Sequence, residues 1–395
     1  MIITNETLQA LRTMVRGEFA AQMAAPGASP VYKKLATIVP SNTGSNTYGW
    51  LGQFPQLREW VGARVVKDIA EGAYAIVNKK YEATLEVKRT DIEDDNLGIY
   101  RPLAAHMAFE VERFFNQSVA DLMADGFNGL CYDGQPFFDT EHPVYPSPDG
   151  TGDPRGVSNI LGSPGASGKS WFLVSLAGPL RPFILQQRSA PEVEEITDPK
   201  NDAVFMRDVY LYGIRCRGNF GYGLWQQAVA SRLDLTPSNY EAARLVMRSF
   251  RRDGGAPLGM IPTHLVVDPS NEAAARALLE MQFSSGGGSN PNYHTAELLV
   301  VDWTSSNANL KTLTVSAGTL SPAFDPAVTS YAVNVAATVS SITVTGTPAE
   351  SGAGVSANNG AAQSLATGPN VITITVTAQN GAVKTYTVTV TRAES

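Results

Sequence analysis

The sequence predicts an α+β protein that carries an all-β sandwich at its C-terminal end. Helical and strand periodicities are interspersed up to about Thr304, and beyond it only period-two alternation remains. The charge changes at the same point. Residues 305–395 hold three basic and three acidic residues, so the preceding part accounts for the whole net charge of −7. We therefore expect two domains of different origin.

The chain begins with a predicted helix and an extended arm. Thr4 or Asn5 can cap a helix whose apolar residues recur at helical spacing until Pro26-Gly27. The polar stretch 39–48 then contains many Ser, Thr and Asn residues, which is typical of an extended segment.

An excursion and a long helix follow. Polar and apolar residues alternate over residues 60–90, and Tyr81–Val87 is the clearest strand, so we expect a long two-stranded excursion. Pro102 opens a helix that ends at Gly126. At ~1.5 Å per residue it would be about 36 Å long, which suits a structural spine.

Two shorter helices are predicted further on. One starts at the capping box Ser238-x-x-Glu241 and runs to about Arg252, and the other covers about Asn271–Phe283. Strands are expected at 264–267 and 298–301, and in the C-terminal segment at 311–316, 330–335, 341–345, 371–377 and 384–391. Several short strands within about 90 residues predict a β-sandwich.

The composition limits the classes of function. Charged residues make up only 17% of the chain, which suggests that much of the surface is buried against other subunits. A nucleic-acid binder usually presents a basic face, so a net charge of −7 argues against one.

Cysteine usage and apolar runs bear on the compartment. Cys131 and Cys216 form no CxxC pair and no metal-ligand spacing, so we expect two reduced thiols and folding in the cytoplasm. No apolar run approaches the length needed to cross a bilayer, and the N-terminus lacks a signal-peptide pattern. We expect no membrane association.

One motif is similar to a phosphate-binding loop. Residues 165–170 read Gly-Ala-Ser-Gly-Lys-Ser, but the motif requires a further Gly at position 163, which is Ser163. The apolar run Trp171–Leu176 predicts a strand, whereas phosphates are bound at the N-terminus of a helix. We therefore expect a turn and no nucleotide.

A few residues could in principle ligate a metal. Cys131, Asp139, Glu141 and His142 lie close in sequence, yet two strong zinc ligands are too few. We expect a turn pinned by polar side chains. With no nucleophile elbow and no Cys/His pairing near a helix start, the sequence predicts no catalytic residue, no metal and no cofactor.

An acidic run precedes the long helix. Asp91, Glu93, Asp94 and Asp95 could bind a cation or cap that helix, but a solvated or inter-subunit charged face is the simpler interpretation.

Several sequence blocks resemble a known family. The run Ser45–Pro55 and then Glu59–Gly62 resemble the major head subunits of Mu-like phages. Further similar blocks follow in order at Glu93–Tyr100, Cys131–Asp139, Glu141–Pro146, Gly221–Gln226 and Met247–Phe250. Residues 305–395 look like a cadherin-like or bacterial Ig-like sandwich, on segments 312–316, 320–326, 329–331 and 384–390.

The resemblance implies the Hong Kong 97-type coat fold of tailed phages. In that fold residues 1–50 would be the N-terminal arm and 51–304 the capsid core. The core would comprise an E-loop at about 58–92, a spine helix at about 98–126 in the peripheral domain, and an axial domain at about 200–290. The sandwich at 305–395 would project outward from the shell, since inside it would compete with packed DNA.

The resemblance also implies a function. The chain would be a major capsid protein that assembles as pentamers and hexamers into an icosahedral head enclosing double-stranded DNA. Expected partners are a scaffolding protein, a portal and cement or decoration proteins, with assembly in the host bacterial cytoplasm and a final location in the virion. The candidate inter-subunit contacts are Tyr48, Trp50, Phe54, Trp60, Arg64, Lys67, Asp94 and Asp95.

Two rival classes of function remain open at this point, an adhesin and an enzyme, and so does a weaker form of the first in which the sandwich decorates the capsid and also binds cells. The chain could be a surface adhesin acting through the sandwich, although the sequence shows no secretion signal. It could be a nucleotide-dependent enzyme. Some relatives of the coat fold cross-link Lys to Asn, but the surroundings of Asn78, Lys79 and Lys80 do not indicate such a bond.

Overall fold

The computed structural model falls into two compact units. It describes residues 5–24, 30–49, 51, 74–94, 100–163, 168–198, 200–284, 286–303, 307–350, 353–379 and 382–394. The first unit comprises Met1–Leu51, Ile69–Val119 and Leu180–Gly223, and the second Gly52–Asp68, Ala120–Pro179 and Leu224–Ser395.

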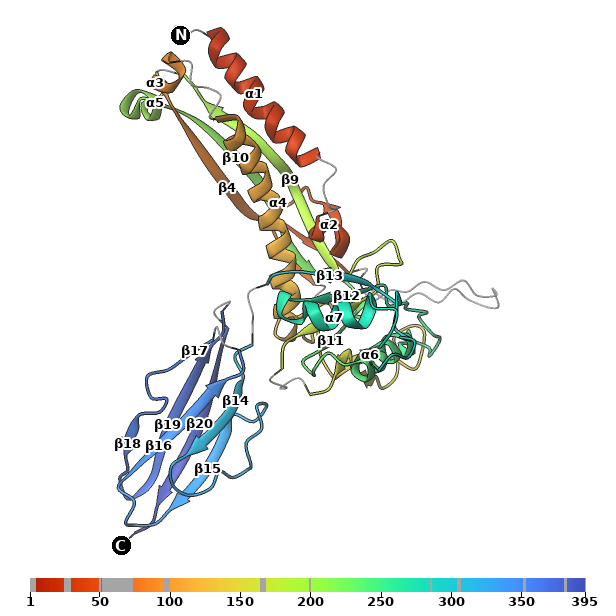
Figure 1. Cartoon of the computed structure of the whole chain (residues 1–395), viewed down its shortest axis with the longest axis vertical. Helices are drawn as coiled ribbons and strands as arrows, with labels where there is room; N and C mark the ends of the chain where they lie inside the picture. Colours follow the sequence, from red (N-terminus) through yellow and green to blue (C-terminus); the bar gives the residue numbers. More distant parts are fainter. Residues whose placement is uncertain are drawn as a thin grey trace. The chain divides into compact units, whose positions relative to one another are not determined.

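A four-stranded sheet forms the frame of the first unit (Figure 1). Its order is β1 (Ala36–Pro40), β9 (Phe183–Ile196), β10 (Val209–Tyr222) and β4 (Lys79–Lys88). β1 runs parallel to β9, and the other neighbours are antiparallel. The helix α5 (Asp202–Arg207) lies at the turn between the two long strands β9 and β10.

Two helices, α1 (Asn5–Ala24) and α4 (Tyr100–Ala124), lie along this sheet (Figure 1). Leu11, Val15 and Phe19 are buried in one cluster with side chains of α4, β9 and β10. The predicted first helix and the predicted long helix are therefore confirmed. The apolar face of α1, which belongs to the expected arm, packs on the chain's own sheet.

Short elements complete the first unit. They are α2 (Val31–Leu35), β2 (Ser45–Thr47), β3 (Ala75–Val77) and α3 (Arg89–Glu93). β3 pairs with β2, while β4 pairs with β10, so the described end of the predicted excursion contributes to two sheets. Residues 52–73 lie outside the described residues.

A five-stranded sheet forms the core of the second unit. Its order is β13 (Glu297–Val300), β12 (His264–Val267), β8 (Trp171–Val174), β11 (Ala228–Ser231) and β7 (Ile160–Leu161). The central strand β8 is fully buried. It is the strand predicted after the Gly-Lys-Ser sequence, and a strand at this position removes the helix that a phosphate-binding loop requires. Residues 164–167 lie outside the described residues.

Both shorter helices end earlier than predicted, at Ser249 and Leu279, and the first also begins at a different cap. α6 (Pro237–Ser249) is capped by Thr236, whose Oγ1 accepts from Asn239 N at 3.2 Å, so the cap predicted at Ser238 was wrong. Pro237 is favourable at the first helical position. α7 (Glu272–Leu279) ends early because Asn290 Nδ2 donates to the carbonyls of Leu278 and Met281.

The C-terminal segment is a two-sheet sandwich. One sheet has the order β14 (Leu310–Val315), β16 (Ser341–Pro348) and β18 (Ala362–Ser364). The other has the order β15 (Ser330–Val335), β20 (Val383–Arg392), β19 (Gly368–Thr377) and β17 (Gly354–Val355). All five predicted strands are confirmed, and the two missed strands span only two and three residues.

The sandwich has a core of its own. Tyr331, Val344, Ile374, Tyr386 and Val388 belong to one buried cluster made up of residues from this segment alone. Across the described part of the whole chain, no helix combines the length and apolar character needed to span a bilayer.

Candidate functional site

The root of the arm is fixed inside the first unit by Tyr48. Its side chain is 2% exposed, and its hydroxyl donates to Gln186 Oε1 at 2.9 Å. Gln186 Nε2 in turn donates to Ile76 O at 2.9 Å and to Asn78 Oδ1 at 2.8 Å. One side chain of β9 therefore holds both the arm and the base of the excursion.

Asn78 extends this network. Its Nδ2 donates to Ser41 Oγ at 3.0 Å and to Thr43 O at 2.8 Å. Ser41 Oγ and Thr43 Oγ1 both donate to Asn46 Oδ1. The side-chain amide of Asn78, which we considered as a cross-linking group, is thus engaged within its own subunit.

Tyr48→Phe is expected to lower the free energy of unfolding by about 1 kcal/mol, because Gln186 Oε1 loses a buried donor. Burial, with a smaller effect of Tyr74, raises the pKa of Tyr48 to about 12. Since the folded pKa lies above the unfolded value of about 10, this stabilisation is complete below pH 10 and is lost as the pH rises towards 12. Denaturant unfolding at pH 7 and above pH 10 measures both effects. The exposed Tyr293 provides a control, and equal losses in Tyr48→Phe and Tyr293→Phe would contradict the assignment.

An apolar pair is exposed at the tip of the first unit. Phe205 and Met206 on α5 are 76% and 77% exposed. α3 lies beside α5 (Figure 1), and Arg89 N at its start donates to the carbonyl of Asp208, the residue after α5, at 3.1 Å. The Arg207 guanidinium also pairs with Glu86 of β4. Polar contacts therefore fix the backbone of the tip, while two apolar side chains remain exposed.

The structure places two of the eight predicted contact residues. Tyr48 is 2% exposed within its own subunit, so its side chain offers little surface to a neighbour. Asp94 follows α3 and is exposed. Trp50, Phe54, Trp60, Arg64, Lys67 and Asp95 lie outside the described residues. Phe205 and Met206 were not among the predicted contacts, although an apolar pair in a short turn between two strands is itself a signal.

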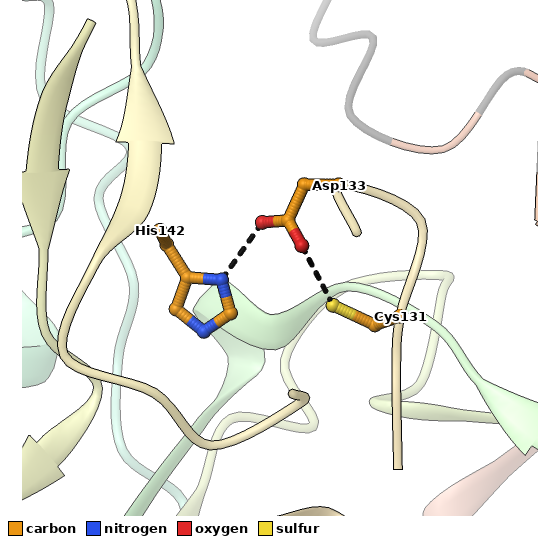
Figure 2. A group of neighbouring side chains, drawn as sticks. All are labelled: Cys131, Asp133 and His142. Atoms are coloured by element: carbon orange, nitrogen blue, oxygen red, sulfur yellow. Dashed lines mark hydrogen bonds and ion pairs between the residues drawn. The ribbon is translucent and has the colours of Figure 1, made fainter. Parts of the chain in front are cut away.

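The second unit contains a buried polar cluster of Cys131, Asp133 and His142 (Figure 2). The Cys131 thiol donates to Asp133 Oδ1 at 3.0 Å, and His142 Nδ1 lies 2.7 Å from Asp133 Oδ2. The His142 side chain is fully buried, and its ring stacks on Trp225 with centroids 4.1 Å apart and planes inclined by 8°.

A tight turn presents Cys131 and Asp133. Cys131 N donates to Gln135 O at 2.8 Å, and Gly134 N donates to Cys131 O at 3.1 Å. Gly134 has φ of +82°, which glycine adopts without strain. Gln135 N donates to Asp133 Oδ1, so the turn also orients the carboxylate.

The predicted pinning of the following turn is confirmed, but with a different set of residues around His142. Asp139 Oδ1 accepts from Glu141 N at 2.8 Å, and Glu141 is exposed. Neither joins the cluster. Asp133 takes their place, and nothing in the local sequence pattern indicates that it meets His142.

The charges within the cluster are coupled. Burial raises the pKa of Asp133. The hydrogen bond and electrostatic interaction with His142, together with hydrogen bonds from the Cys131 thiol and Gln135 N, outweigh this effect and hold the pKa below its usual range. Burial, followed by the charge of Asp133, raises the pKa of the Cys131 thiol. The carboxyl is therefore the ionised member of the cluster and the thiol the neutral one.

Asp133→Asn is expected to lower the free energy of unfolding at pH 7 by about 2 kcal/mol, since hydrogen bonds to a charged group contribute about 1.5–3 kcal/mol. The folded pKa is depressed, so this stabilisation is present above the unfolded value of about 3.9 and is lost as the pH falls through the folded value. Unfolding curves at pH 7 and in acid measure the change. Asp153→Asn, at an exposed position, should be neutral; a difference between the variants that persists unchanged in acid would contradict this account.

The class of protein follows from solved structures that share this fold. The chain is similar to a subunit of the "Procapsid of bacteriophage JBD30", with a TM-score of 0.69 and 43% identity over 76% of this chain and 99% of that one. It is also similar to a subunit of the "Bacteriophage JBD30 capsid", with a TM-score of 0.60 and 33% identity over the same shares. The class is thus a phage coat protein.

The sequence comparisons define the family. The model described as Mu-like prophage major head subunit gpT matches residues 8–304, and the chain belongs to this family. The major capsid protein of Escherichia phage Mu is 42% identical over 306 residues, which is 77% of this chain and 100% of that protein. The Mu-like prophage FluMu major head subunit of Haemophilus influenzae is 44% identical over 259 residues, covering 65% of this chain and 84% of that protein.

The predicted function is confirmed at this level: the chain is a major capsid protein of the Mu-like type. Residues 310–393 match a model described as a cadherin-like beta sandwich domain. Because the phage Mu protein is matched over its whole length without this segment, the sandwich is an addition relative to it. The comparisons give no support to the adhesion alternative.

Proposed function

We propose that this major capsid protein assembles as pentamers and hexamers into an icosahedral head around double-stranded DNA. Its 42% identity to the whole of the phage Mu capsid protein carries this proposal. A scaffolding protein and a portal would direct assembly in the bacterial cytoplasm. One similar structure is titled as a capsid "decorated with minor capsid protein trimers", which supports a comparable partner here.

We assign segments of the chain to the parts of the coat fold. Residues 1–50 act as the arm, about 58–92 as the E-loop, about 98–126 as the spine helix and about 200–290 as the axial domain. Trp50, Phe54, Trp60, Arg64, Lys67, Asp94 and Asp95 remain the proposed contacts with neighbours. The network around Gln186 supports the E-loop role, because it fixes the base from which such a loop would extend.

The tip formed by α3 and α5 would be a further contact between copies. Phe205 and Met206 lie on a backbone held by ion pairs and hydrogen bonds, so little conformational entropy is lost when they are covered. Apolar burial contributes about 25 cal/mol per Å², and the same tip recurs on every copy in a shell.

Imaging tests the proposed assembly. Electron microscopy of particles formed by the chain with its scaffolding protein should show closed shells, and averaging should resolve rings of five and six copies. Open sheets, tubes or unassembled monomers under all scaffold conditions would contradict the proposal.

The sandwich would lie on the outside of the head. It has its own core and no net formal charge, and a folded module inside would occupy volume needed for DNA. A peptide tag placed after Ser395 should therefore bind its antibody on intact, DNA-filled heads. Labelling that occurs only after the heads are opened would place the sandwich inside.

A further inference from the structure

We propose that Cys131, Asp133 and His142 form a binding site for one Zn²⁺ ion in the coat subunit. Their ligand atoms all lie within 4.8 Å of one another. Zinc binds sulfur at about 2.3 Å and nitrogen or oxygen at about 2.0–2.2 Å, so donors of one tetrahedral site are separated by roughly 3.5 Å. The side chains need only small shifts to surround an ion.

The donor set favours zinc over other common cations. A thiolate and an imidazole are soft or borderline ligands, which Mg²⁺ and Ca²⁺ avoid. Thiolate and carboxylate together carry two negative charges, which one Zn²⁺ ion neutralises. This balance matters because His142 is fully buried and Cys131 is 4% exposed.

The imidazole can bind the metal through Nδ1 once this atom gives up its hydrogen bond to Asp133. This requires its proton to reside on Nε2, and His142 Nε2 is buried without a hydrogen-bond partner among the described residues. The tautomer change therefore breaks no hydrogen bond at that atom. The stack on Trp225 fixes the plane of the ring, and Gln135 N holds the Asp133 carboxylate, so both ligands are already oriented.

Binding of the ion changes the protonation of two ligands. On binding, the Cys131 thiol releases its proton to solvent, and the His142 proton moves from Nδ1 to Nε2. The hydrogen bonds from Cys131 and His142 to Asp133 are replaced by bonds from all three residues to the metal. A water molecule takes the fourth position, as in other zinc sites with three protein ligands. The ion would link the turn at residues 131–135 to the strand β5 (His142–Val144).

Cobalt provides a spectroscopic test, since Co²⁺ bound by a thiolate shows sulfur-to-metal charge-transfer absorption. The full-length chain, stripped with a chelator and titrated with Co²⁺ and then Zn²⁺, should bind one ion per chain. It should show this absorption and lose it on zinc addition. Zinc should also raise the Tm.

Two matched variants locate the site. Cys131→Ser should abolish the charge-transfer band and weaken zinc binding by more than the ~10–100-fold that loss of a supporting group causes. Cys216→Ser, which removes the other buried thiol, should leave both unchanged. The proposal is overturned if the wild-type chain binds less than one ion or shows no band, or if the band survives in Cys131→Ser. If that variant fails to fold, the wild-type stoichiometry and band, with their persistence in Cys216→Ser, decide the matter.

Discussion

Phe205→Asp combined with Met206→Asp is expected to stop shell assembly while leaving the subunit folded. Both side chains are more than three-quarters exposed, so their replacement removes little packing inside the subunit. In an assembled shell, the two added carboxylates would face a neighbour across a contact that excludes water. An unpaired charge in such a place costs several kcal/mol, and this cost recurs at every equivalent contact.

Sedimentation and electron microscopy of particles measure this effect. The expected result is at least a tenfold loss of closed shells, with far-ultraviolet circular dichroism and Tm within error of the wild type. Val371→Asp is the matched control, since this apolar residue is 66% exposed but lies on the sandwich. Normal shell yield from the tip variant would show that α5 makes no contact between copies.

Trp225→Ala is expected to destabilise the second unit by about 3–5 kcal/mol. The Trp225 side chain is 1% exposed and packs against both His142 and Phe250, so its removal leaves a cavity beside the buried hydrogen bond between His142 and Asp133. The stacked imidazole also loses the surface that fixes its orientation. The free energy of unfolding from denaturant titration measures the cost, and soluble yield should fall with it.

Phe205→Ala is the comparison for this variant, because it removes an aromatic ring that is exposed. That change should stay within about 0.5 kcal/mol of the wild type. Similar costs for the two variants would mean that Trp225 has no special role in the packing around His142.

Periodicity in the sequence was sufficient to predict α1, α4 and the long strands of the sandwich, because each has one consistently apolar face. It could not say what that face packs against. The stripe of Leu11, Val15 and Phe19 suits a neighbouring subunit as well as its own sheet, and the structure shows the latter. An amphipathic pattern predicts which side of a helix is buried, but it does not predict whether that side packs on its own subunit or on a neighbour.

The errors at helix ends have a local cause. Thr236 and Ser238 can both cap a helix, and the capping-box pattern favoured Ser238. Pro237 favours a start at its own position, because its ring fixes φ and its missing N–H costs nothing in the first turn.

The cluster around His142 could be predicted only in part. Cys131 and His142 could be selected as potential ligands from residue type alone. The approach of Asp133 depends on the turn at Gly134 and on the ring stack with Trp225, which is more than 80 residues further along the chain. Contacts between residues so far apart in the chain produce no periodic pattern in the sequence.

The central claim is that residues 1–304 contain the whole assembly machinery and that the sandwich is an added module. Electron microscopy of shells from the full chain and from a variant lacking residues 305–395, each produced with the same scaffolding protein, tests it most directly. Closed shells of equal diameter and similar yield are predicted for both. Shells from the full chain alone, or from neither, would contradict it.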